Sequence, residues 1–150
     1  MSAPVLRANH DLVAQAWLAG VPGLSVAMVA SALPSDVTTW TQAGFVVVET
    51  VGGAPDIDVP LRKPVMSVSC WAVAPDSHKP PWGKANNLAE HISAACQDHQ
   101  ACVRVVDLPD GFPFAQVHTV YLLNEPRRIT SDDPGYARYS FDLQLMWVEL

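Results

Sequence analysis

Hydrophobic and polar residues alternate most regularly near the end of the chain, over residues 137–147. Every second position there is apolar, at Ala137, Tyr139, Phe141, Leu143, Leu145 and Trp147. The positions between them carry Arg138, Ser140, Asp142, Gln144 and Met146. Successive side chains of a β-strand point to opposite faces, so this period of two predicts a strand with one buried face and one face toward solvent or a partner.

Two earlier apolar runs predict a β-hairpin with a long tip. Residues 45–51 and 64–73 are rich in valine and lie next to glycine or proline. The segment between them, residues 52–60, holds two glycines, two prolines and two aspartates, which predicts a loop between paired strands. Proline and aspartate discourage pairing with an open sheet edge and leave an extended shape, so this tip could reach a neighbouring subunit.

Apolar residues at helical spacing predict two helices. The first begins at Asn9 or Asp11, either of which can cap a helix, and ends near Gly20. The second covers residues 84–99, with its apolar stripe at Leu88, His91 or Ile92, Ala95 and Cys96. The loop before it, residues 73–81, is rich in proline, which restricts φ and opposes helix.

The remaining segments predict an α+β domain. Residues 102–106 and 115–124 have the composition of strands, with a turn at 107–113 and a hydrophilic connection at 125–135. Residues 21–39 give the weakest pattern, in which 24–28 and 29–33 suggest a short strand and a turn. The whole order predicts one domain over residues 1–150, with two helices packed on a mostly antiparallel sheet.

Composition agrees with a single buried core outside a membrane. A chain of 150 residues with 49% hydrophobic content can bury roughly 70% of its unfolded surface. Prolines and charged residues interrupt every apolar run before it reaches about 18 residues, so no membrane span is predicted. The first residues lack the pattern of a secretory signal, and we therefore expect folding in a cytoplasm.

The charge distribution argues against tight, static binding of nucleic acid. Nine basic and fifteen acidic residues give a net charge of −6. The basic residues are scattered, apart from the pairs Arg62-Lys63 and Arg127-Arg128. Affinity for nucleic acid comes largely from neutralising several phosphates together, which this distribution does not favour.

Cysteine and histidine patterns indicate neither a disulfide framework nor a metal centre. Cys70, Cys96 and Cys102 are odd in number and form no CxxC pair. Cys70 lies in a predicted strand and Cys96 on the inner stripe of a predicted helix, where cysteine usually acts as a small buried hydrophobe. The five histidines include no HExxH motif, and His91 and His99 are about two helical turns apart. No metal or cofactor is expected.

Catalytic motifs are also absent. The chain has no GxSxG motif, and Ser67 and Ser69 lie within a predicted strand. Neither Gly52-Gly53 nor the segment around Lys84 has the spacing of a phosphate-binding loop. The carboxylate pairs Asp56/Asp58 and Asp132/Asp133 lie in turns, where solvated residues are commoner than an acid and base. We therefore expect no catalytic residues.

The residues that stand out are of the types found at protein interfaces. Tryptophan and arginine are enriched at interface hot spots, which draws attention to Trp82 in the proline-rich loop and to Arg127 and Arg128. Trp82 could equally fill the edge of its own core, and the two arginines could equally lie in a solvated loop. The candidate interface residues are Asp56, Asp58, Arg62, Trp82, Lys84, Arg127 and Arg128.

Several short segments resemble the tail terminator proteins of siphophages that infect actinobacteria. They are VPLR at 59–62, SCWA at 69–72, KPPWGKANNLAE at 79–90, YLLNEPRR at 121–128 and DPGYARY at 133–139, followed by the final strand to Trp147. Together they cover about two thirds of the chain. The predicted order of helices and strands also fits the fold of that family.

This resemblance implies a structural virion protein of the tail neck. It implies a homo-hexameric ring on the head-proximal end of the tail tube, which contacts the tube protein below and the head-closure or connector protein above. It also implies that DNA passes through the lumen without specific binding, for which an acidic or neutral wall is suited. Two alternatives stay open: another head-closure or neck component, and a small-ligand-binding or enzymatic cytoplasmic domain.

Overall fold

A computed structural model describes residues 4–77, 79–130, 133 and 135–150 of the chain. Asp132 and one of the five histidines, His78, lie outside the described residues. The helices are α1 (His10–Ala19), α2 (Trp82–Gln97) and α3 (His99–Cys102), with 3-10 turns η1 (Val26–Met28) and η2 (Val37–Thr39). The strands are β1 (Val29–Ala30), β2 (Phe45–Gly52), β3 (Val65–Val73), β4 (Arg104–Val106), β5 (Ala115–Leu122), β6 (Arg127–Ile129) and β7 (Tyr136–Glu149).

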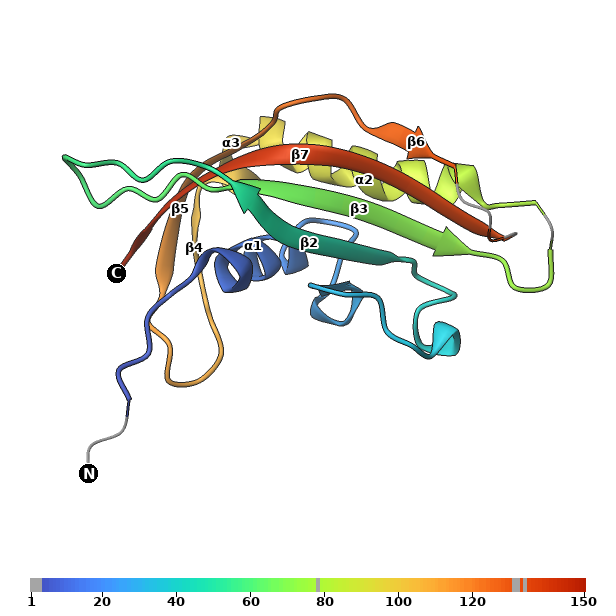
Figure 1. Cartoon of the computed structure of the whole chain (residues 1–150), viewed down its shortest axis with the longest axis horizontal. Helices are drawn as coiled ribbons and strands as arrows, with labels where there is room; N and C mark the ends of the chain where they lie inside the picture. The colour runs from blue at the N-terminus through green and yellow to red at the C-terminus, as the bar shows by residue number, and fades with distance from the viewer. Residues whose placement is uncertain (1–3, 78, 131–132, 134) are drawn as a thin grey trace.

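All seven strands form one sheet, in which every pairing except β1 with β2 is antiparallel. The order is β1-β2-β3-β7-β5-β4, and β6 also pairs with β7. The long strand β7 therefore lies at the centre of the sheet, as Figure 1 shows. The predicted α+β class with a mostly antiparallel sheet is confirmed.

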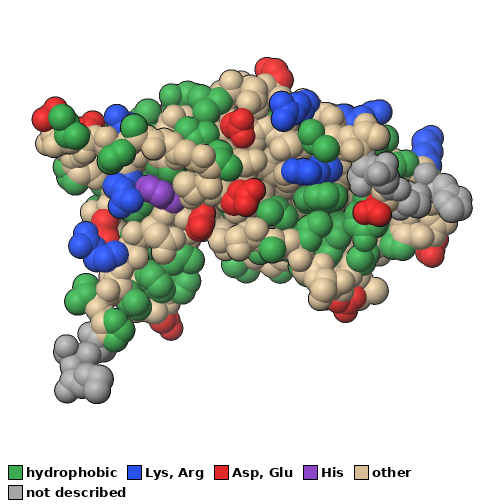
Figure 2. All heavy atoms as spheres, viewed as in Figure 1, with side chains coloured by type: hydrophobic (Ala, Val, Ile, Leu, Met, Phe, Trp, Pro, Cys, Tyr) green, Lys and Arg blue, Asp and Glu red, His purple; other side chains and the backbone are tan. Residues whose placement is uncertain are grey.

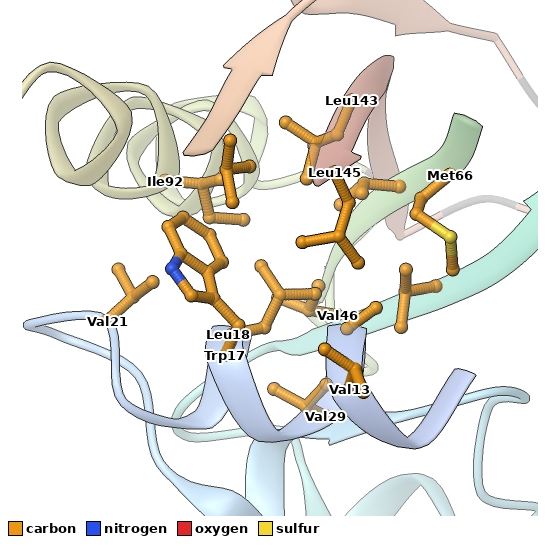
Figure 3. Close-up of a cluster of buried hydrophobic side chains, with 14 of the residues drawn as sticks. Val13, Trp17, Leu18, Val21, Val29, Val46, Met66, Ile92, Leu143 and Leu145 are labelled. Atoms are coloured by element: carbon orange, nitrogen blue, oxygen red, sulfur yellow. The ribbon is translucent and has the colours of Figure 1, made fainter. Parts of the chain in front are cut away.

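The main core lies between one face of the sheet and the two longer helices. α1 packs over β1 and β2, whereas α2 packs over β3, β7 and β5. In Figure 3, Trp17 and Leu18 of α1 point toward Ile92 of α2 and toward Leu145 of β7. The predicted alternation of β7 is confirmed on this face, because its apolar residues are buried or packed against the core.

The opposite face of the sheet is covered only at one end. A small second cluster forms there around Trp40, Phe45 and Val73, with Trp71 and Tyr136 packed against it. Beyond this cluster, the face carries polar and half-buried side chains from β2, β3 and β7. In Figure 1, α2 lies behind β7, so the open face is the one turned to the viewer.

Two predicted boundaries differ from those in the structure. α2 begins at Trp82, two residues before the predicted start, directly after Pro81, whose ring holds φ at −82°. Cys102 ends the short helix α3 and does not begin a strand; Asp98 caps that helix by accepting a hydrogen bond from the backbone N–H of Gln100.

Two further differences concern segments that the sequence described as turn or connection. The predicted strand at 24–28 is largely the 3-10 turn η1, and only Val29–Ala30 pairs with the sheet. The predicted hydrophilic connection at 125–135 contains β6. Because β5 pairs with residues 143–149 of β7, the edge of β7 at 138–140 would have unpaired backbone groups, and β6 pairs with them.

Candidate interaction surfaces

The end of β2 and the segment that joins it to β3 project far beyond the sheet (Figure 1). We call residues 51–64 the hairpin extension. Its aliphatic side chains have little cover: Ile57 is 93% exposed, Val51 56% and Val59 50%. These three aliphatic residues lie within nine positions of the chain, which makes the projecting segment a candidate surface for binding another protein.

The acidic tip of the hairpin extension is ordered by one carboxylate. The carboxylate of Asp56 accepts hydrogen bonds from the backbone N–H of Asp58 at 2.9 Å and Val59 at 3.1 Å, and its second oxygen lies 3.5 Å from Nζ of Lys63. These hydrogen bonds, with the charge of Lys63, lower the pKa of Asp56. Asp58 is exposed and has no ion pair within the described residues.

Arg62 fastens the base of the extension to β7. Its backbone forms two hydrogen bonds with the backbone of Trp147, of 2.8 and 2.9 Å, and its guanidinium lies 5.3 Å from the centre of the Trp147 ring. A hollow of about 190 Å³ is lined by His10, Arg62 and the glycines of the extension. A second hollow, of about 480 Å³, lies among Arg62, Trp147 and Glu149. Both hollows are open to solvent and mainly polar.

Trp82 and Arg128 meet where the start of α2 lies near β6, toward the end of the molecule opposite the hairpin extension (Figure 1). The guanidinium of Arg128 lies 4.3 Å from the centre of the Trp82 ring, and Tyr139 contacts the same ring edge-on with centroids 6.2 Å apart. Trp82 therefore covers the edge of its own core with one side and carries an exposed cation on the other. Arg127 is exposed, and β6 holds it beside Arg128.

Lys84 has a structural contact within the chain. Its ammonium donates hydrogen bonds to the backbone carbonyls of Thr41, at 2.9 Å, and Gln42. These contacts tie α2 to the segment that precedes β2. The structure thus places Asp56 and Asp58 at the tip of the hairpin extension and Arg62 at its base. Trp82 and Arg128 meet elsewhere, and Lys84 belongs to neither place.

Sequence reasoning missed a third arrangement, on the open face of the sheet. Arg138 donates hydrogen bonds to Oγ of Ser69 from Nε at 3.1 Å and from Nη2 at 3.0 Å, and its guanidinium lies 5.2 Å from the Trp71 ring centre. A hollow of about 240 Å³ lies beside it, lined also by Leu33, Val47, Glu49 and Ser67. Residue type gave no signal for this site, because it depends on the register of three strands.

Lys and Arg side chains gather over the end of the face where β6 and β7 lie, and hydrophobic side chains lie next to them (Figure 2). Among the described residues, Arg138 has no carboxylate within ion-pair distance. An arginine held by a serine and a tryptophan, beside a hollow with both apolar and polar lining, presents donors to an acidic group from outside the chain.

The described residues offer little for covalent or metal chemistry. No group of three His, Cys, Asp or Glu side chains in them could hold a metal ion. Burial raises the pKa of the Cys70 thiol, and burial with a smaller effect of Cys102 raises the pKa of Cys96 to about 12. His118 is exposed on β5.

No helix in the described part of the chain is long and apolar enough to cross a bilayer. Comparison of the sequence with protein-family models and with curated proteins found no match.

Proposed function

We propose that this protein is a structural component of a phage virion that closes the head-proximal end of a tail tube. In this proposal six copies form a ring in the neck region of the tail, after synthesis in the host cytoplasm. The ring stops polymerisation of the tube protein and presents a docking surface to the head-closure or connector protein. The observation that carries the proposal is the hairpin extension, a projecting segment with exposed aliphatic and acidic side chains.

Further support comes from the number of separate surfaces on one small domain. The hairpin extension, the Trp82–Arg128 pair and the open sheet face lie on different parts of the molecule. A ring subunit between two other rings needs contacts with its own copies, with the tube and with the connector. The resemblance of segments 59–62, 69–72 and 79–90 to tail terminators agrees with this requirement.

Termination in this proposal is geometric. Repeated contacts between different surfaces of identical chains close into a ring that matches the last tube ring on one side. The other side lacks an equivalent surface, so no further tube ring can add. Through the lumen DNA passes without specific binding, which fits a chain with a net charge of −6. A strongly basic lumen in an assembled ring would contradict that part of the proposal.

The test is polymerisation of the tube protein encoded by the same phage genome, with and without this chain. We expect shorter tubes, with gold-labelled chain at one end only when viewed by electron microscopy. Tubes of unchanged length without end label would refute the terminator role. Binding to the connector alone would instead identify a head-closure component, and a monomer that binds a small ligand would identify the third alternative.

A further inference from the structure

We propose that the tip of the hairpin extension of one copy occupies the hollow beside Arg138 of a second copy, with Ile57 against Val47 and Trp71 and with Asp58 paired to Arg138. The contact between two copies can exist whatever the function of the protein is. Only the closure of repeated contacts into a ring rests on the proposed function. It names the two surfaces that join neighbouring subunits, and a second copy of this chain is the occupant.

The tip has the features of an inserting segment. Ile57 is 93% exposed, the highest value among the large hydrophobic residues of the described chain. The loop that carries it is already held by the hydrogen bonds and the Lys63 contact of Asp56, so its insertion costs less ordering entropy than that of a free loop. Asp58 beside it has no ion pair in the described structure.

The hollow complements the tip in size, polarity and charge. Its volume of about 240 Å³ is several times the roughly 30 Å³ that a water molecule occupies in the liquid, so it can accept a side chain. Leu33, Val47 and Trp71 provide apolar lining, and Arg138 provides a cation that no carboxylate of the described chain pairs. Glu49 on the opposite rim disfavours the reverse orientation, because it would place Asp58 beside another carboxylate.

The tip of the hairpin extension lies away from the hollow of its own chain. The hollow runs along β3 from Ser67, two residues beyond the start of that strand at Val65, to Trp71, six residues beyond it and roughly 20 Å away along the strand. The extension leaves the sheet at the β3 start and points away from the hollow (Figure 1). A contact between these two different surfaces must therefore join separate copies, and repetition produces either a closed ring or a filament.

Photo-cross-linking of the purified full-length chain tests the contact. Benzoylphenylalanine replaces Ile57 in one sample and Val26, which is 80% exposed on η1, in the control sample. We expect covalent dimers from the first sample, with cross-links to residues 33, 47 or 71, and none at these residues from the second. Dimers linked elsewhere, or no dimers at millimolar concentration, would overturn the proposal.

Charge exchange gives an independent measurement by sedimentation velocity. We expect Asp58→Arg or Arg138→Glu to weaken self-association about tenfold or more, because each places like charges together. The double variant should recover most of the loss, and Asp110→Arg, an exposed turn residue outside both surfaces, should change little. No recovery in the double variant would contradict the pairing. If the chain shows neither the cross-links nor the charge recovery but still caps tubes, the contact proposed here is refuted and the proposed function is not.

Discussion

The indole nitrogen of Trp147 donates a hydrogen bond of 3.2 Å to Nδ1 of His10, and Nη2 of Arg62 lies 3.2 Å from Nε2 of the same ring. A neutral imidazole has one acceptor nitrogen and a protonated one has none. Both neighbours of His10 are donors, so protonation would remove the single acceptor and place a cation next to a guanidinium. The three residues together favour neutral His10.

This arrangement predicts a loss of stability in mildly acidic solution. Burial, and then the charge of Arg62, lowers the pKa of His10, while Asp11 opposes the shift. The unfolded chain therefore binds this proton more readily, so the contribution to stability is complete above about pH 6.5 and falls as the pH drops toward the pKa of the folded protein. Asp56 and Glu149 also have lowered pKa values, but they titrate below about pH 4.5.

Urea unfolding at pH 7.5 and 5.5 provides the measurement. We expect the wild type to lose stability over this interval and His10→Gln to lose less, because glutamine keeps an acceptor and cannot take up the proton. The exposed His118 is the matched control, so His118→Gln should follow the wild type. An equal loss in all three proteins would contradict this role of His10.

We expect the conservative substitution Trp17→Phe to destabilise the protein strongly. Its Nε1 donates a buried hydrogen bond of 3.0 Å to the backbone carbonyl of Cys102, which joins α1 to α3. Trp17→Phe leaves that carbonyl without its partner, and we expect a loss of about 1–3 kcal/mol in the free energy of unfolding. Trp82→Phe is the control at a half-buried position, with a smaller expected loss. Chemical denaturation distinguishes the two.

The adjacent glycines Gly52 and Gly53 should respond in opposite ways to alanine. Gly53 has φ of +110°, and a Cβ there would lie 2.5 Å from the carbonyl oxygen of Lys63. Gly53→Ala should therefore destabilise the protein by at least about 1–2 kcal/mol. A Cβ at Gly52 meets nothing within 4 Å, so Gly52→Ala should be neutral or slightly stabilising. Thermal unfolding that shows equal shifts would argue against this geometry.

The contact of Arg128 with Trp82 predicts a modest energetic coupling. Removal of the guanidinium in Arg128→Ala should cost about 0.5–1 kcal/mol, as expected for an exposed cation over an aromatic ring. The exposed neighbour Arg127 is the control, with an expected cost below about 0.5 kcal/mol on substitution by alanine. A double-mutant cycle with Trp82→Leu should give a coupling term that vanishes for Arg127.

The thiols should be unreactive in the folded protein. Cys70 and Cys102 are buried, and Cys96 has a pKa of about 12, so little thiolate exists near neutral pH. We expect an aromatic disulfide reagent at pH 8 to label almost no thiol in native protein and all three after denaturation. Rapid labelling of one thiol in the native state would instead point to an activated cysteine.

The sequence predicts an element of this fold well where the element's own residue pattern determines it, and poorly where strand register determines it. The alternation of β7 and the stripe of α2 are local, and both elements were predicted within a few residues. β6 was missed because Arg127, Arg128 and Ile129 have no strand pattern of their own. They pair only because β5 leaves part of the β7 edge open.

The same distinction applies to the candidate surfaces. Asp56 and Asp58 could be placed on a projecting tip, since the glycines and prolines around them are a local signal. Trp82 and Arg128 were each singled out by residue type, but their contact depends on β6 pairing. Arg138, Trp71 and Ser69 come together only through the pairing of β3 with β7, so no property of the separate residues predicted that hollow.

The central position of β7 has a consequence for the order of events during synthesis. β7 separates β3 from β5, yet its residues leave the ribosome after those of the other six strands. Until then, the β2–β3 and β4–β5 ribbons have no common neighbour, and the apolar faces that α1 and α2 will cover cannot be joined. Folding of this domain is therefore completed after translation of the last strand, and nascent chains that stall before residue 136 expose both ribbons to aggregation.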